Sequence, residues 1–139
     1  LEGVAVAARM NLADQHIVAG AYDHAEAILR SDEAEGVEML ALGVKAAEVV
    51  LMRGDVEGLG TLLDNLSQGC NYHELPTCGL KVAWLDARLD ARAGDVDGML
   101  AKLELVLRES GPGARDRVLR EPDFDPYLDR MDLQALLSD

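Results

Sequence analysis

Aromatic and basic residues are both scarce in this chain of 139 residues. Aromatics make up 4% of it, so the core must be built from Leu, Val, Ala and Met, which suits closely packed helices. Lys and Arg number 13 against 26 Asp and Glu, and the net charge of −13 argues against nucleic acid or an anionic membrane surface as partner. The same acidity is compatible with a basic or amphipathic peptide ligand, or with solubility alone.

Long hydrophobic runs are also missing. No segment approaches the roughly 18 apolar residues needed to span a bilayer, so we expect no membrane insertion. Apolar residues at 49% and charged residues at 28% argue against disorder, and the length fits a single domain over residues 1–139. Because the chain begins at Leu1 rather than Met, we expect a fragment or processed form of a larger protein. Its compartment stays open, with the cytoplasm slightly favoured.

Three glycines mark the organisation of the chain. Gly20, Gly54 and Gly94 each end an apolar-periodic segment, and a new segment begins two or three residues later. Gly20 and Gly54 lie 34 residues apart, which is the period of a helix–turn–helix array. Gly54 and Gly94 lie 40 apart, so the second repeat carries about six extra residues.

The apolar periodicity predicts an all-α chain of six main helices in three antiparallel pairs, with short helices after them and no strand. The predicted helices span residues 4–19, 22–30, 37–53, 55–67, 79–93 and 95–109. The helix over 37–53 is apolar on more than one face, so we expect it to be covered on two sides. Asp55 is expected to cap the fourth helix, and residues 68–77 are expected to be irregular.

The residues around the glycine turns resemble the tetratricopeptide repeat (TPR) family. The matching positions are Leu12, Ala13, Gly20, Tyr22 and Ala25 in the first repeat, Ala46, Ala47, Val50, Gly54 and Val56 in the second, and Ala87, Gly94 and Val96 in the third. Other positions depart from the family pattern. Leu59 and Met99 replace a small residue, and Asp86 and Asp90 stand where apolar residues are expected.

The C-terminal segments 120–126 and 133–137 are similar to the segment that closes many bacterial arrays of this family. The resemblance implies a right-handed superhelix of about three antiparallel helix pairs plus short C-terminal capping helices. The repeats would span about 4–34, 37–68 and 79–110, and the cap 114–138. The residues expected to cover the exposed end are Phe124, Leu133, Leu136 and Leu137. An irregular helical bundle is the alternative.

The family also implies a function, which is to bind a peptide or helix of another protein in a groove lined by the first helix of each pair. The expected partner contacts are Arg9, Asn11, His16, Lys45, Glu48, Trp84 and Arg88. Trp84 and Arg88 lie four residues apart and could stack as an interface anchor, or Trp84 could be a core residue. The alternative function is self-association, or a scaffold segment within a larger protein.

Cys70 and Cys78 bracket the inserted segment and lie near helix ends, so they could form a disulfide or remain two reduced thiols. A disulfide would point to an exported or periplasmic protein. With His73 the two cysteines offer three zinc ligands but no evident fourth, so no metal site is predicted.

Catalytic residues are not predicted either. His16 and His24 flank the first turn near Asp14 and Asp23, but no nucleophile or oxyanion site accompanies them. The acidic residues between 123 and 132 lack the Gly and Glu of a calcium loop. We therefore expect no enzyme and no cofactor. An unrecognised His/Asp site is the remaining hypothesis from the enzyme class.

Overall fold

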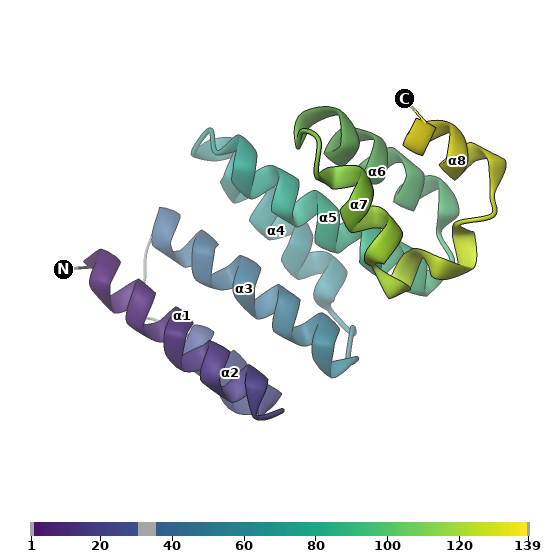
Figure 1. The fold of residues 1–139 in the computed structure, drawn as a ribbon. Coiled ribbons are helices and arrows are strands. Elements are labelled where there is room, and N and C mark those ends of the chain that lie inside the picture. The colour runs from purple at the N-terminus through teal and green to yellow at the C-terminus, as the bar shows by residue number, and fades with distance from the viewer. Residues whose placement is uncertain (1, 31–35, 139) are drawn as a thin grey trace. The chain divides into compact units, whose positions relative to one another are not determined.

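The structure, a computed structural model, describes residues 2–30 and 36–138, with the backbone alone for residues 2–5. Every regular element among them is a helix, which confirms the all-α prediction. The elements are α1 (Glu2–Val18), α2 (Tyr22–Leu29), α3 (Val37–Arg53), α4 (Leu59–Tyr72), α5 (Pro76–Ala93), α6 (Val96–Glu109), α7 (Ala114–Arg120), the 3₁₀ helix η1 (Pro122–Tyr127) and α8 (Met131–Ser138) (Figure 1). Residues 31–34, expected to end the first repeat, lie outside the described residues.

The chain divides after Gly79 into two compact units. The first holds α1 to α4 and the first turn of α5, and the second holds residues 80–93 of α5 and everything after them. The division into repeats proposed from the sequence stays a prediction.

Small residues let the helices of the first unit approach closely. There α1 packs against both α2 and α3, α2 packs against α3, and α3 packs against α4. The core between α1, α2 and α3 contains Ala13, Ala25, Leu29, Leu42, Ala46 and Val49. All six are at most 2% exposed, and Ala supplies three of them, as expected of a core poor in aromatic residues.

Helix α3 is buried on two sides, as its sequence predicts. Its buried residues are Leu40, Leu42, Val44, Ala46, Ala47, Val49, Val50 and Leu51. Gly43 faces α4 so closely that a Cβ there would lie 2.7 Å from Leu66 Cδ2. The absence of a side chain at Gly43 is therefore part of the contact between α3 and α4.

The three turn glycines adopt the left-handed conformation in which glycine commonly ends a helix. Their φ angles are 78° at Gly20, 89° at Gly54 and 78° at Gly94. A residue with a Cβ is strained at such angles, so glycine is the natural choice where a helix ends in this way. After Gly94, Asp95 caps α6 by accepting a hydrogen bond from the backbone of Gly98.

The predicted boundaries between residues 54 and 79 are wrong. Helix α4 begins at Leu59 after Gly58, which has a φ of 76° and no capping side chain, so Asp55 is not its N-cap. The stretch 68–77 is largely helical, because α4 continues to Tyr72 and α5 begins at Pro76. Gly69 does not break α4, and a Cβ there would lie 2.5 Å from Leu40 Cδ2. Pro76 starts α5, where its missing N–H leaves no helical bond unmade.

The second unit is built around α6, which contacts both α7 and α8, while η1 packs against α7. Lys102 ties α6 to α5 through ion pairs with Asp86 (3.2 Å) and Asp90. Of the predicted capping residues, Phe124, Leu133 and Leu137 are buried and Leu136 is half-buried. They lie in the core of this unit.

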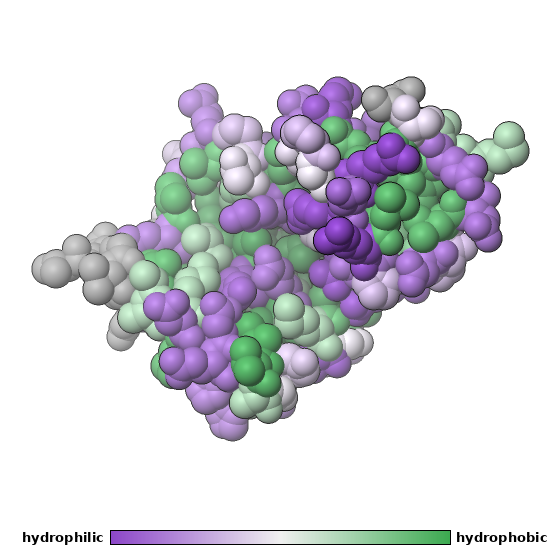
Figure 2. All heavy atoms as spheres, in the orientation of Figure 1, coloured by the Kyte–Doolittle hydropathy of each residue, from purple (hydrophilic) through white to green (hydrophobic). Residues whose placement is uncertain are grey.

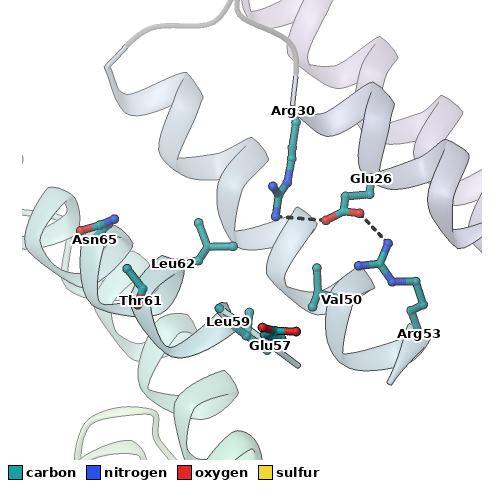
Figure 3. Close-up of a pocket in the computed structure, with 10 residues that line it drawn as sticks. Glu26, Arg30, Val50, Arg53, Glu57, Leu59, Thr61, Leu62 and Asn65 are labelled. Atoms are coloured by element: carbon teal, nitrogen blue, oxygen red, sulfur yellow. Dashed lines mark hydrogen bonds and ion pairs between the residues drawn. The ribbon is translucent and has the colours of Figure 1, made fainter. Parts of the chain in front are cut away.

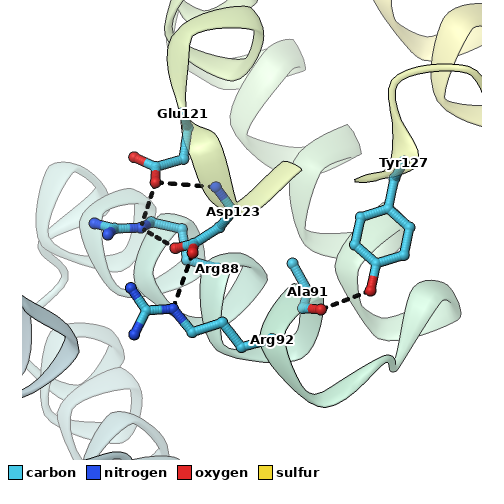
Figure 4. Close-up of polar contacts among 6 residues, drawn as sticks. All are labelled: Arg88, Ala91, Arg92, Glu121, Asp123 and Tyr127. Atoms are coloured by element: carbon cyan, nitrogen blue, oxygen red, sulfur yellow. Dashed lines mark hydrogen bonds and ion pairs between the residues drawn. The ribbon is translucent and has the colours of Figure 1, made fainter. Parts of the chain in front are cut away.

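The segment after α7 is fixed to α5 by polar contacts (Figure 4). Asp123 accepts hydrogen bonds from Arg88 Nε and Arg92 Nε, each at 2.9 Å. The hydroxyl of Tyr127 donates to the carbonyl of Ala91 at 2.6 Å. These contacts hold η1 against the last two turns of α5.

Candidate functional site

A pocket of about 340 Å³ opens in the first unit between α2, the end of α3 and the start of α4. Apolar side chains of Val50, Leu59 and Leu62 form its floor, with Leu62 half-buried and the other two almost fully buried. The polar residues that line it are Glu26, Arg30, Arg53, Glu57, Thr61 and Asn65. The volume lies near the lower end of ligand pockets, which suits one or a few side chains.

One edge of the pocket is an ion-pair chain that links α2 to α3 (Figure 3). Glu26 bridges two arginines, with Oε1 3.0 Å from Arg30 Nη2 and Oε2 2.6 Å from Arg53 Nη1. Arg53 Nη1 also lies 2.8 Å from Asp23. Hydrogen bonds with Asp23 and Glu26 raise the pKa of Arg53. Both arginines therefore already have carboxylate partners. The Nε atom of Arg53 is buried and lacks an acceptor within residues 2–30 and 36–138.

The opposite edge of the pocket belongs to α4 and to the turn before it. Leu59, Thr61 and Leu62 lie along this edge in Figure 3, with Asn65 one turn further on. Glu57 precedes α4 in the turn that Gly54 and Gly58 allow, and it is exposed. In the described part of the chain Glu57 has neither an ion pair nor a hydrogen bond, unlike the other charged residues of the pocket.

The sequence-predicted contacts of the first unit lie elsewhere, on α1 and α3. Lys45 pairs with Asp14 of α1 at 3.0 Å and with Glu48 at 3.6 Å. Burial lowers the pKa of Lys45, but the hydrogen bond that Lys45 donates to Asp14 and the charge of Glu48 outweigh burial, so the pKa lies above its ordinary value. Lys45 thus joins α1 to α3.

The other predicted contacts on α1 are less constrained. Asn11 is exposed, and Arg9 and His16 are half-buried. The ring of His16 stacks on that of His24 across the α1–α2 turn, with centroids 5.6 Å apart. The two histidines that flank the first turn in the sequence are therefore in contact in the structure.

Trp84 and Arg88, the two predicted contacts on α5, both have partners within the second unit. Trp84 is 9% exposed and meets Phe124 edge-on at 5.4 Å, so it belongs to the core of the second unit. Arg117, not Arg88, lies over its ring. Arg88 instead bonds to Asp123 and lies 3.4 Å from Glu121, and its side chain is 16% exposed. The guanidinium of Arg88 thus links α5 to the start of η1, where Glu121 and Asp123 lie.

Cys70 and Cys78 form a disulfide between the end of α4 and the first turn of α5, with Cα atoms 5.6 Å apart. Of the two alternatives from the sequence, the structure therefore has the bonded form. Both sulfurs are used in this bond and not as metal ligands with His73. Over the described ranges, no three His, Cys, Asp or Glu side chains gather as a metal site would require.

Sequence reasoning missed every polar residue of the pocket. It expected the groove on the first helices of the pairs, whereas the pocket involves α2 and α4, the second helices, together with the end of α3. One signal was available: Arg53 precedes the turn at Gly54, and Asp23 and Glu26 follow the turn at Gly20. Opposite charges at corresponding turns of neighbouring hairpins indicate a bridge between them.

Comparison of the chain with protein-family models, with curated proteins and with solved structures found no match. Among the described helices, none has the length and apolar character that crossing a membrane requires.

Proposed function

We propose that this chain is a TPR-like repeat domain that binds a segment of another protein. The helix packing of the first unit supports the repeat arrangement, because α2 contacts both α1 and α3 while α1 also contacts α3. A second helix that packs between successive first helices is what stacked helix pairs require. Left-handed glycines at the three hairpin turns are consistent with the same repeat.

The pocket between α2, α3 and α4 is the observation that supports binding. It combines an apolar floor with hydrogen-bonding groups on its rim, which is the usual composition of a binding site. Its polar edge is already ordered by the bridge from Glu26 to Arg30 and Arg53, so little side-chain ordering is needed when a ligand enters. Hydrophilic residues cover much of the face that Figure 2 shows. The polar residues that line the pocket would confine an incoming apolar side chain to its floor.

Selection from a random dodecapeptide library tests this function. Peptides that bind the purified chain are labelled, and their dissociation constants are measured by fluorescence anisotropy. We expect Leu62→Asp to weaken binding about tenfold or more, because it places a charge on the apolar floor. The matched control is Leu12→Asp, on an exposed α1 leucine outside the pocket. It should leave the affinity unchanged.

The outcomes separate the possible functions. A library that yields no binding peptide contradicts the proposal. Light scattering during size exclusion tests self-association, because a stable dimer whose formation Leu62→Asp abolishes would assign the pocket to a second copy. Peptides that are sensitive to Leu12→Asp but not to Leu62→Asp would place the interface on α1 and α3, near Lys45 and Glu48.

A further inference from the structure

We propose that the pocket recognises a basic side chain next to an apolar one, with Glu57 as the counter-charge of the ligand's Lys or Arg. This inference rests on the proposed function and names the chemistry of its ligand. It follows from three features of the pocket, which are the state of its charges, its floor and its surroundings.

The ion pairs already present in the pocket determine which charge of a ligand it favours. Arg30 and Arg53 are both bound to Glu26, so an anionic ligand would have to compete with a carboxylate already held at 2.6 to 3.0 Å. Glu57 is the pocket's charged residue with no partner within residues 2–30 and 36–138. A cation entering the pocket therefore gains a partner without breaking an ion pair.

The local excess of carboxylates also favours a cationic ligand. Glu26 and Glu57 line the pocket, and Asp23 and Asp55 lie beside Arg53, at 2.8 Å and 3.9 Å from its guanidinium nitrogens. These four carboxylates face two guanidiniums, which leaves a local charge of −2. The chain as a whole carries −13, so the long-range field also attracts cations.

The floor determines what accompanies the basic group. Val50, Leu59 and Leu62 offer apolar contact, and Leu62 is still partly exposed. The hydroxyl of Thr61 and the amide of Asn65 lie on the α4 edge and can bond to the backbone of a bound segment. A segment with an aliphatic side chain and a neighbouring Lys or Arg matches the floor and Glu57 together.

A double-mutant cycle tests the pairing. Peptides selected against the wild-type chain are resynthesised with norleucine in place of each Lys or with citrulline in place of each Arg, and they are titrated against wild type, Glu57→Gln and Glu57→Lys. Removing either charge should weaken binding about two- to fivefold, and removing both should cost no more than removing one. Charge reversal at Glu57 should weaken binding further. Glu104→Gln, an exposed carboxylate on α6, is the control and should change nothing.

Three results would overturn the inference while the chain's binding of a protein segment stands, and the first two concern charge. One is selected peptides without an excess of Lys and Arg, and the other is strictly additive losses in the cycle. Binding that responds to Leu12→Asp instead of Leu62→Asp also excludes it, since the ligand would then lie outside the pocket. A library without any binder removes the proposed function and this inference together.

Discussion

The guanidinium carbon of Arg117 lies 4.5 Å from the centre of the Trp84 ring. Arg117 belongs to α7 and Trp84 to α5, and Phe124 of η1 meets the same ring edge-on. One indole therefore joins three elements of the second unit, with a cation on one face and a buried phenyl group at 5.4 Å. Since Trp84 is the sole tryptophan of the chain, its fluorescence reports on the folding of this unit.

Replacing Trp84 with alanine should destabilise the second unit strongly. Loss of a buried Trp costs about 3–5 kcal/mol in transfer energy and cavity formation. Arg117→Gln removes only the cation from an exposed site and should cost about 0.5–1 kcal/mol. Urea unfolding followed by circular dichroism measures both. Equal losses for the two variants would show that Trp84 is not a core residue.

The carboxylate of Asp123 should stabilise the second unit only where it is ionised. Burial raises the pKa of Asp123, but hydrogen bonds from Arg92 and Arg88 outweigh burial, so its pKa in the folded chain lies below the ordinary value. A lowered folded pKa means stability that is present above the unfolded pKa of about 3.9 and lost as pH falls through the folded pKa. Asp123→Asn should cost about 1–3 kcal/mol at neutral pH.

Acid titration distinguishes this ion pair from general acid sensitivity. Urea midpoints from Trp84 fluorescence should differ between wild type and Asp123→Asn at neutral pH, approach each other below about pH 4, and coincide once the pH lies below the lowered folded pKa of Asp123. Asp129→Asn, an exposed carboxylate in the same C-terminal segment, is the control and should follow wild type throughout. A difference between Asp123→Asn and wild type that persists at low pH would mean that shape, rather than charge, explains the loss.

Lys102 explains the two acidic residues that depart from the repeat pattern. Asp86 and Asp90 lie on α5, their side chains are 20% and 13% exposed, and the ammonium group of Lys102 neutralises both. Burial lowers the pKa of Lys102, but the hydrogen bonds that Lys102 donates to Asp90 and Asp86 outweigh burial, so the pKa lies above its ordinary value. The contribution of Lys102 is thus complete below an unfolded pKa of about 10.4 and is lost as pH rises through the higher folded value.

Two variants of Lys102, Asp86 and Asp90 test whether the stability contributed by these three charges is coupled. Lys102→Met alone removes the ammonium group shared by Asp86 and Asp90 and should cost about 1–3 kcal/mol. The combination with Asp86→Leu and Asp90→Leu restores the apolar residues that the repeat pattern expects, and it should recover most of that loss. If the triple variant is less stable than Lys102→Met, the acidic residues have another role in the second unit.

Apolar periodicity and glycine placement were sufficient for the all-α class and for the positions of most of the six main helices. The φ angles at Gly20, Gly54 and Gly94 follow directly from the way each apolar stripe stops. The failures lie between residues 54 and 79, where local signals opposed the packing. Asp55 reads as a cap and Gly69 as a breaker, yet α4 begins at Leu59 and continues past Gly69, which lies close against Leu40 of α3.

The candidate site was harder to predict, because its residues come from three helices and a turn. Periodicity assigns Glu26, Arg53 and Glu57 to exposed positions but cannot show that two hairpins bring them to one pocket. The sequence left two roles open for Trp84 for a related reason, because Phe124, which meets its ring, lies 40 residues later in the chain. Such contacts depend on tertiary structure, which spacing along one helix does not contain.

The disulfide between Cys70 and Cys78 should contribute measurably to stability. Cys70 is 1% exposed at the end of α4, and the bond closes a loop with a sequence separation of eight residues. On the chain-entropy model such a loop restricts the unfolded chain by about 2–3 kcal/mol. Dithiothreitol should therefore lower the urea midpoint of the wild-type chain, and intact mass should rise by two hydrogens. The double variant Cys70→Ala/Cys78→Ala should have the lower urea midpoint both with and without dithiothreitol. An unchanged wild-type midpoint after confirmed reduction would show that packing alone holds the α4–α5 turn.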